Sequence, residues 1–258
     1  MYFIARVVYF FHGPPYPRLP YELDGFIAAR SRFLLQREFT WARHSFLYNI
    51  AYPTWPTEWH QITVKMAYFD WLATGQKTIL ERHQDLLAFN TYAYLINRTT
   101  ALVTKPSPDL PTRDIVDWPE NSRDGYVFTR VNTVVNSYAA QTTRMLAQLG
   151  VREMATTSES LVVAMNAALF SSTQGRYCDG VCADANHTSL HASMFPLAFK
   201  LVPPERMTSV VEWGASASTR RLSLTTHVQY RRSNLIFCFL YPSGYSWVLI
   251  RVYTGTYT

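Results

Sequence analysis

Apolar side chains recur at helical spacing along most of the chain. Between residues 26 and 50 they fall three or four positions apart, from Phe26 to Ile50, which predicts one long helix. A proline-rich turn containing Pro53 and Pro56 follows. Each proline removes a backbone donor and disfavours the helical conformation of the residue before it, so the helix should end there.

The same periodicity predicts further helices downstream. They cover residues 58–73, 77–97, 131–150, 152–169 and 188–201, with a short one after Pro204. The two windows that meet at Gly150 are joined so closely that they should form an antiparallel helical hairpin. Residues 98–128 form a long loop rich in proline and aspartate, and loops of that length are often functional. No strand pattern is visible before Gly214.

Paired antiparallel helices joined by alternating short and long loops are typical of a helical toroid or a solenoid. No fixed sequence period is visible, which favours the toroid. After Gly214 the pattern becomes β-like, in residues 222–228 and 245–253, with a turn at Pro242-Ser-Gly. We therefore predict a mainly α fold, a partial (α/α)6 toroid of helical hairpins, with a short irregular or β-like C-terminal tail.

The charge of the chain does not indicate a nucleic-acid partner. The formal net charge is +6, but residues 214–258 contain arginines and no acidic residue, so most of the excess lies in the tail. No apolar window is long enough to span a bilayer, and residues 1–11 make a poor signal peptide. We expect neither nucleic acid nor membrane as a partner, and the compartment stays open.

Three cysteines are too few for the disulfide framework of a small secreted domain. Cys178 and Cys182 are close enough to form a bridge across a short loop, or they are free thiols. Metal binding is less favoured, because no second pair at ligand spacing accompanies them, and His187 and His191 are spaced for a helix face as readily as for a metal site. We expect no metal and no cofactor.

Acidic residues lie beside aromatic ones in two of the predicted loops. Glu58 and Trp59 follow the proline-rich turn, and Asp117 and Trp118 lie in the long loop. Carboxylates accept hydrogen bonds from sugar hydroxyls, and aromatic faces cover the C–H side of a sugar ring. The alternative for each is structural: Asp117 caps a turn, Glu58 begins a helix near its positive end, and the indoles pack inward.

Four ordered motifs carry a family resemblance. They are Arg18-Leu-Pro-Tyr-Glu-Leu-Asp-Gly25, Thr54-Trp-Pro-Thr-Glu-Trp59, Asp117-Trp-Pro119 with Arg123-Asp-Gly-Tyr126, and Ser189-Leu-His-Ala-Ser-Met-Phe-Pro-Leu-Ala-Phe199. In this order they resemble glycoside hydrolase family 78, the α-L-rhamnosidases, over about three quarters of the chain. The resemblance implies a six-hairpin (α/α)6 glycosidase domain that cleaves terminal α-L-rhamnose with inversion.

The resemblance also assigns positions in the catalytic site. Tyr21 and Asp24 match the sugar-contacting aromatic and aspartate of the family, whereas the place of the general acid falls on Pro17, which has no ionisable group. Glu22 is the nearest carboxylate and is the weak candidate for the acid. Inversion also needs a separate base to activate water. The resemblance stops after Trp213, so no residue is assigned as that base.

These observations give one set of predictions. Residues 1–17 form an irregular segment, 18–213 a partial six-hairpin glycosidase domain and 214–258 a divergent basic tail. The chain is an α-L-rhamnosidase-like hydrolase with impaired or no catalysis, acting on a rhamnose-containing glycoside. The alternative is a non-catalytic sugar-binding remnant or truncated gene product. An incomplete barrel would expose apolar surface and favour self-association. The predicted sugar contacts are Tyr21, Asp24, Glu58, Trp59, Asp117 and Trp118.

Overall fold

The computed structural model describes residues 21–35, 38–221, 230–231, 234–240 and 247–253. This part of the chain is mainly helical, as predicted. In order its helices and strands are α2 (Glu22–Leu35), α3 (Thr40–Ala51), α4 (Thr57–Thr74), α5 (Thr78–Phe89), the 3-10 turns η2 (Ala93–Leu95) and η3 (Glu120–Ser122), α6 (Thr133–Leu149), α7 (Met154–Ala168), β1 (Phe170–Ser171), β2 (Arg176–Tyr177), α8 (Leu190–Ala198), α9 (Pro204–Arg221), β3 (Tyr230–Arg231), β4 (Asn234–Leu240) and β5 (Trp247–Tyr253).

The single helix predicted for residues 26–50 is wrong, because the chain forms two helices there. Helix α2 ends at Leu35 and α3 begins at Thr40, whose backbone N–H donates to Glu38 Oε1 at 2.6 Å. The two helices pack against each other through aromatic rings, with the Phe33 ring 5.7 Å from that of Phe46. Both segments keep the helical spacing of apolar residues, so the periodicity alone does not reveal the break.

Helix α4 confirms the prediction for residues 58–73. It begins directly after Pro56 and ends at Thr74; the capping residue Gly75 adopts a left-handed φ of 71° and donates its N–H to Trp71 O at 2.7 Å. Helix α5 is shorter than the predicted segment 77–97. It ends at Phe89, and the chain then turns through Tyr92, which has a left-handed φ of 62°, into η2.

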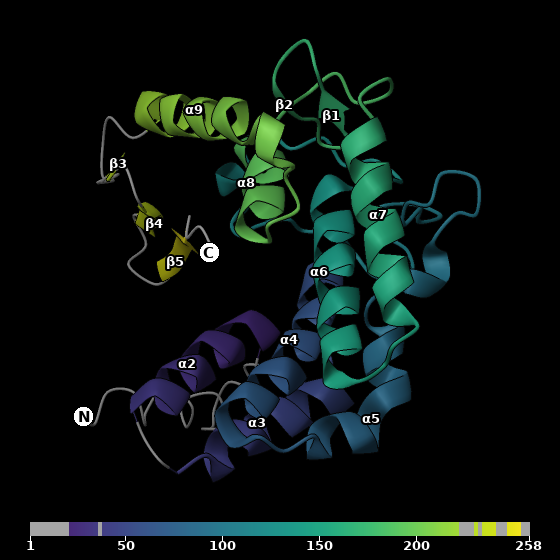
Figure 1. Ribbon diagram of the computed structural model, residues 1–258, viewed down its shortest axis with the longest axis vertical. Helices are drawn as coiled ribbons and strands as arrows, with labels where there is room; N and C mark the ends of the chain where they lie inside the picture. Colours follow the sequence, from purple (N-terminus) through teal and green to yellow (C-terminus); the bar gives the residue numbers. More distant parts are fainter. Residues whose placement is uncertain (1–20, 36–37, 222–229, 232–233, 241–246, 254–258) are drawn as a thin grey trace.

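Helices α6 and α7 form the predicted antiparallel hairpin, and they lie side by side in Figure 1. The Asn132 side chain caps α6 by accepting hydrogen bonds from Val134 N and Val135 N. Gly150, with a φ of 123°, lies at the C-terminal end of the same helix. Most α6 side chains are buried, which places this helix at the centre of the core.

Residues 98–128 form the predicted long loop, with η3 as its main regular segment. The next loop contains the two-residue antiparallel pair β1 and β2, which the sequence did not predict. Helix α9 is longer than the short segment predicted after Pro204, and it continues past position 214. The predicted domain boundaries stay a prediction.

The β-like character predicted for residues 245–253 is confirmed in part, since β5 covers Trp247–Tyr253 and pairs antiparallel with β4. The predicted segment 222–228 and the turn at Pro242-Ser-Gly lie outside the described residues.

Figure 1 shows how the helices are arranged. Helices α2 and α3 lie at one end of the α4–α6–α7 group, and α8 and α9 lie at the other. Contacts of α4 with α2 and α6, and of α6 with α8, connect the two ends through one hydrophobic core. None of the helices in the described part of the chain combines the length and the apolar character needed to cross a bilayer.

Candidate functional site

The proline-rich turn and the start of α4 bring three aromatic rings together. The Tyr21 ring lies edge-on to the Trp59 ring at a centroid distance of 4.8 Å. The Trp55 ring is 6.4 Å from Trp59 and is exposed. Edge-to-face pairs of this kind are favourable beyond the area that they bury. The structure thus brings Tyr21 and Trp59, both predicted sugar contacts, into one cluster.

Glu22 joins the start of α2 to this turn. Its carboxylate accepts hydrogen bonds from Thr54 N and Thr54 Oγ1, each at 2.5 Å, and the residue is fully buried. Burial raises the pKa of Glu22, and the two Thr54 bonds offset part of that rise. Both oxygens are therefore engaged within the protein, and Glu22 holds the turn in place.

Asp24 lies three residues beyond Tyr21 on α2. Its side chain is largely buried, and this burial raises its pKa. Contact of Asp24 with a sugar stays a prediction.

Glu58 is buried at the first turn of α4 and holds the long loop. Its carboxylate accepts hydrogen bonds from Ile115 N at 3.1 Å and Val116 N at 2.9 Å. Val116 has a φ of 61°, and a β-branched residue rarely adopts this left-handed conformation. Such strain persists only where surrounding contacts hold it, and the Glu58 carboxylate supplies two of them.

A second buried carboxylate, Asp114, lies close to Glu58. It pairs with Lys105, and Asn132 Nδ2 donates to Asp114 Oδ2 at 3.0 Å. Lys105 Nζ also donates to Thr57 Oγ1 at 2.9 Å, which ties the network to the start of α4. Burial, followed by the charge of Asp114, raises the pKa of Glu58 to about 7. This network fixes the loop that precedes Asp117.

Asp117 lies where the long loop meets helix α8. Its Oδ2 is 3.0 Å from His191 Nε2, and its Oδ1 accepts a hydrogen bond from Trp118 N at 2.7 Å. Arg123 Nε donates to the Asp117 carbonyl at 2.8 Å. The Trp118 side chain is 60% exposed. The result is a firmly held carboxylate beside an accessible indole face, a pairing suited to a sugar ring.

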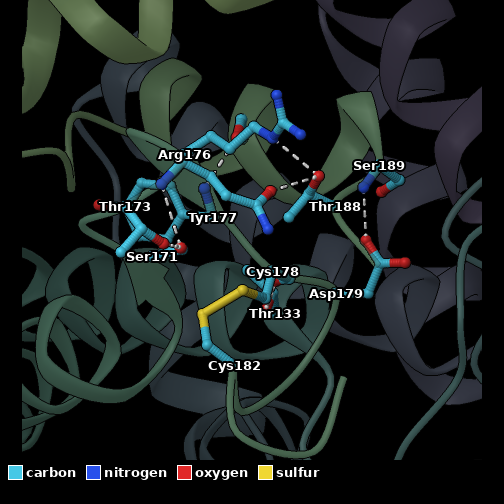
Figure 2. Close-up of a disulfide and its surroundings, with 12 residues drawn as sticks. Thr133, Ser171, Thr173, Arg176, Tyr177, Cys178, Asp179, Cys182, Thr188 and Ser189 are labelled. Atoms are coloured by element: carbon cyan, nitrogen blue, oxygen red, sulfur yellow. Dashed lines mark hydrogen bonds between the residues drawn. A yellow bond between two sulfur atoms is a disulfide. The ribbon is translucent and has the colours of Figure 1, made fainter. Parts of the chain in front are cut away.

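Of the two alternatives for Cys178 and Cys182, a bridge or free thiols, the structure shows the bridge: the two residues form a disulfide (Figure 2). The loop that it closes contains the buried Asp179. Asp179 Oδ1 accepts a hydrogen bond from Ser189 N at 2.7 Å, and Oδ2 accepts one from Val127 N at 2.8 Å. Asp179 therefore links the end of the long loop to the start of α8.

The structure arranges the predicted residues in two groups. Tyr21 and Trp59 lie with the proline-rich turn, whereas Asp117 and Trp118 lie at the junction with α8. Glu58 belongs to both regions, since it begins α4 and holds the loop before Asp117. That all six residues bind one sugar stays a prediction.

Several residues of the network were not predicted. Lys105, Asp114 and Asn132 act through contacts with distant segments, which spacing does not reveal. The spacing of His191 from His187 fitted a helix face as readily as a metal site, and no contact with Asp117 was predicted. The sequence offered one signal for His191, its position two residues after Ser189, which caps α8. The start of a helix is a frequent binding position. Within the described residues no cluster of three or more His, Cys, Asp or Glu side chains is arranged to hold a metal.

Comparison with a family model identifies the domain. The model described as the bacterial α-L-rhamnosidase six-hairpin glycosidase domain matches residues 45–228, well over half of the chain. The match agrees with the helical hairpins of the structure and confirms both the predicted resemblance and the predicted fold class. No curated protein sequence matches the chain.

Two solved structures share the fold. A rhamnosidase from Klebsiella oxytoca with rhamnose bound has a TM-score of 0.59 and 14% identity, over 81% of this chain and 46% of that one. A family 78 rhamnosidase of Bacillus sp. GL1 has a TM-score of 0.50 and 16% identity, over 61% of this chain and 17% of that one. The chain thus spans less than half of the length of either protein.

Proposed function

Because the chain belongs to the bacterial α-L-rhamnosidase six-hairpin glycosidase family, we propose that it recognises terminal α-L-rhamnose and does not itself hydrolyse the glycoside. The observation that carries the recognition is the Asp117 carboxylate, held firmly beside the exposed face of Trp118. The similar Klebsiella oxytoca protein has rhamnose bound, which supports rhamnose as the sugar.

The proposed absence of turnover is supported by the lack of a suitable general acid. Pro17 occupies the place at which the family resemblance expects a carboxylic acid, and proline cannot transfer a proton. Glu22 has the raised pKa that suits a general acid, but it is fully buried and both of its oxygens accept hydrogen bonds from Thr54. A general acid must reach the leaving oxygen, and Glu22 is engaged elsewhere.

Recognition is tested by titrating the chain with L-rhamnose in a calorimeter. We expect measurable binding that weakens at least tenfold in both Asp117→Asn and Trp118→Ala, a loss of about 1.4 kcal/mol or more. The matched control is Trp41→Ala, which removes another exposed indole, at the start of α3. D-Mannose and D-glucose serve as control sugars. Equal affinity in all three variants would contradict the site, and no binding by the unaltered chain would contradict the function.

Hydrolysis is tested with a nitrophenyl α-L-rhamnoside. We expect no release of nitrophenol above background. Clear release that disappears in Glu22→Gln would show that Glu22 is the acid and that the chain is an active rhamnosidase, the alternative function. That function is favoured by family membership and by the raised pKa of Glu22.

Self-association is a further part of the proposal. Several large apolar side chains are exposed among the described residues, including Tyr52, Leu72 and Val163. Exposed apolar surface promotes association when it is contiguous. Sedimentation velocity over a range of concentrations would show it as a mass above that of the monomer, and a monomer at every concentration would contradict it.

A further inference from the structure

Helix α8 presents a buried histidine to the Asp117 carboxylate. His191 is the second residue of the helix, its side chain is 7% exposed, and its Nε2 is 3.0 Å from Asp117 Oδ2. The two residues are 74 positions apart in sequence. The pair therefore joins the long loop to the helical core at the position where the sugar is expected.

The surroundings determine which ring nitrogen carries the proton. An ionised carboxylate only accepts hydrogen bonds, so the nitrogen facing Asp117 has to donate. His191 Nδ1 is buried and has no hydrogen-bond partner among the described residues. A proton on Nδ1 would be a buried donor without an acceptor, which is costly, whereas a bare Nδ1 only leaves a lone pair unused. The geometry favours the tautomer with hydrogen on Nε2.

The start of α8 is held by two buried carboxylates, which accept from the backbone N–H groups of the two residues before His191. Asp124 Oδ2 accepts a hydrogen bond from Leu190 N at 2.5 Å, and Asp179 Oδ1 accepts one from Ser189 N at 2.7 Å. Ser189 Oγ accepts from Ala192 N and caps the helix. Figure 2 shows the contact between Asp179 and Ser189 beside the disulfide loop. The imidazole therefore projects from a fixed point.

Asp117 is held along its backbone from the other side. Glu58 accepts a hydrogen bond from the preceding residue, Val116, and Arg123 Nε donates to the Asp117 carbonyl. These contacts fix where the residue lies. Contacts to the carboxylate itself oppose its rotation, among them those from Trp118 N to Oδ1 and from His191 Nε2 to Oδ2. A carboxylate oxygen has two lone pairs and so can accept more than one hydrogen bond.

We infer that His191 is a positioning residue, whose Nε2–H holds the Asp117 carboxylate in the orientation that receives a hydroxyl of the sugar beside Trp118. The inference rests on the proposed function, since it assigns a role within the same site. His191 acts through Asp117 and needs no contact with the ligand. Preorganisation of this kind raises affinity because the free protein has already lost the rotational freedom of the carboxylate.

Two substitutions separate positioning from simple packing. His191→Gln keeps an N–H donor at about the reach of Nε2, whereas His191→Leu fills the space and removes the donor. We expect the calorimetric Kd for L-rhamnose to rise at least tenfold in the leucine variant and less than threefold in the glutamine variant. The control is His44→Leu, which replaces an exposed histidine of α3 and should change the Kd less than threefold.

Thermal unfolding of the same variants gives the comparison that decides. If His191 served only for packing, the variants with the lower melting temperatures would also have the weaker affinity for L-rhamnose. His191→Gln would then weaken binding at least as much as His191→Leu. That outcome, or an unchanged Kd in His191→Leu while the unaltered chain binds rhamnose, would overturn the inference and leave the proposed function intact.

A measurement without ligand tests the pair itself. Long-range proton–nitrogen NMR spectra of the histidine rings should show His191 with hydrogen on Nε2 and a bare Nδ1, and its signals should move in Asp117→Asn. Hydrogen on Nδ1, or no response to that substitution, overturns the inference whether or not rhamnose binds. Absence of rhamnose binding by the unaltered chain overturns the proposed function and the sugar-orienting role with it.

Discussion

At the scale of single residues, the buried charged side chains of this chain hold backbone segments together. Glu22 fixes the proline-rich turn, Glu58 fixes the long loop, and Asp179 fixes the start of α8. A carboxylate can accept several backbone N–H bonds at once, so one side chain can satisfy donors that a loop leaves unpaired. Each such use requires an acidic residue inside the core, and burial raises the pKa of Glu22 and of Glu58.

Glu58 should make stability depend on pH. The fold raises its pKa from 4.5 to about 7, so between these values the folded state retains a proton that the unfolded state releases. The free energy of unfolding should therefore fall as pH rises from 4.5 to 7, by roughly 3 kcal/mol at most, and stay level above 7. Glu58→Gln should lack this slope in urea unfolding measured across the range.

The control for that measurement is Glu120→Gln, which neutralises an exposed glutamate of the loop 98–128 that Glu58 holds. It should keep the slope of the unaltered chain. If Glu58→Gln showed the same dependence on pH as the unaltered chain, Glu58 would be ionised throughout the range.

Lys65 should act in the opposite direction at higher pH. Its Nζ lies 4.6 Å from the Phe199 ring centroid and 5.4 Å from that of Tyr138. Burial, followed by the charge of Arg30, lowers its pKa from 10.5 to about 7. Between these values the unfolded state binds a proton that the folded state does not, so the free energy of unfolding should rise with pH from 7 to 10.5.

Lys65→Met should remove that rise, while Lys200→Met, at an exposed lysine, should keep it. Urea unfolding between pH 7 and 10 measures both. If the free energy of unfolding of Lys65→Met rose with pH as it does in the unaltered chain, groups other than Lys65 would cause the pH dependence.

At the scale of helices and loops, a close approach of two loops gives a sharp test of packing. A Cβ added at Gly180 would lie 2.3 Å from Thr129 Oγ1 and 2.6 Å from Val131 O. The second contact is with backbone, so it cannot be relieved by a rotamer change. Gly180→Ala should lower the free energy of unfolding by about 3 kcal/mol or more, a value outside the common range for single substitutions.

Gly75→Ala is the matched control. Gly75 has a φ of 71°, but a Cβ there would meet nothing within 4 Å, so the substitution should cost only about 1 kcal/mol of backbone strain. Urea unfolding compares the two. Equal losses would show that the loop around Gly180 can move apart from residues 129–131 without large cost.

The predictability of these elements follows from how local their signals are. Helices α4, α6 and α7 have both apolar periodicity and glycine or proline signals at an end, and the sequence predicted each one. The break between α2 and α3 has neither glycine nor proline. The apolar periodicity therefore continues across it and predicted a single helix. The pair β1 and β2 is two residues long in each strand, which is too short to show an alternating pattern.

The candidate site was less predictable, because its contacts join distant segments. The sequence identified Asp117 and Trp118 through their composition and resemblance. It could not show that Glu58 would be buried against a loop 57 residues away, or that His191 would face Asp117. Such pairings are decided by how the helices pack, and no spacing rule reports them without an alignment or a structure.

At the scale of the whole molecule, the fold is conserved well beyond the sequence. Identity of 14% with the Klebsiella oxytoca rhamnosidase accompanies similarity over 81% of this chain. Helical packing tolerates exchange of apolar residues when volume and pattern are kept, so the core can diverge while its geometry stays. The motifs at 54–59 and 117–126 lie in or beside loops, which often hold the chemistry of a site on such a scaffold, whereas the motif at 189–199 lies in α8.

The disulfide should contribute moderately to global stability. It joins Cys178 to Cys182, four residues apart, and so closes a small loop. The entropy that a cross-link removes from the unfolded chain grows with loop length, and for so short a loop it corresponds to about 2 kcal/mol. In a molecule of this size that would lower the melting temperature by about 4–8 °C on reduction.

Calorimetric scans with and without a thiol reductant measure that loss. The control is the double variant Cys178→Ser/Cys182→Ser, which should melt at the temperature of the reduced protein under both conditions. Complete unfolding on reduction is not expected, because the same loop is also held by Thr133 N to Asp179 O at 2.9 Å and Thr133 Oγ1 to Cys178 O at 2.6 Å. Loss of all cooperative melting in the double variant would show that the bridge is required for folding, and an unchanged melting temperature would show that these hydrogen bonds alone hold the loop.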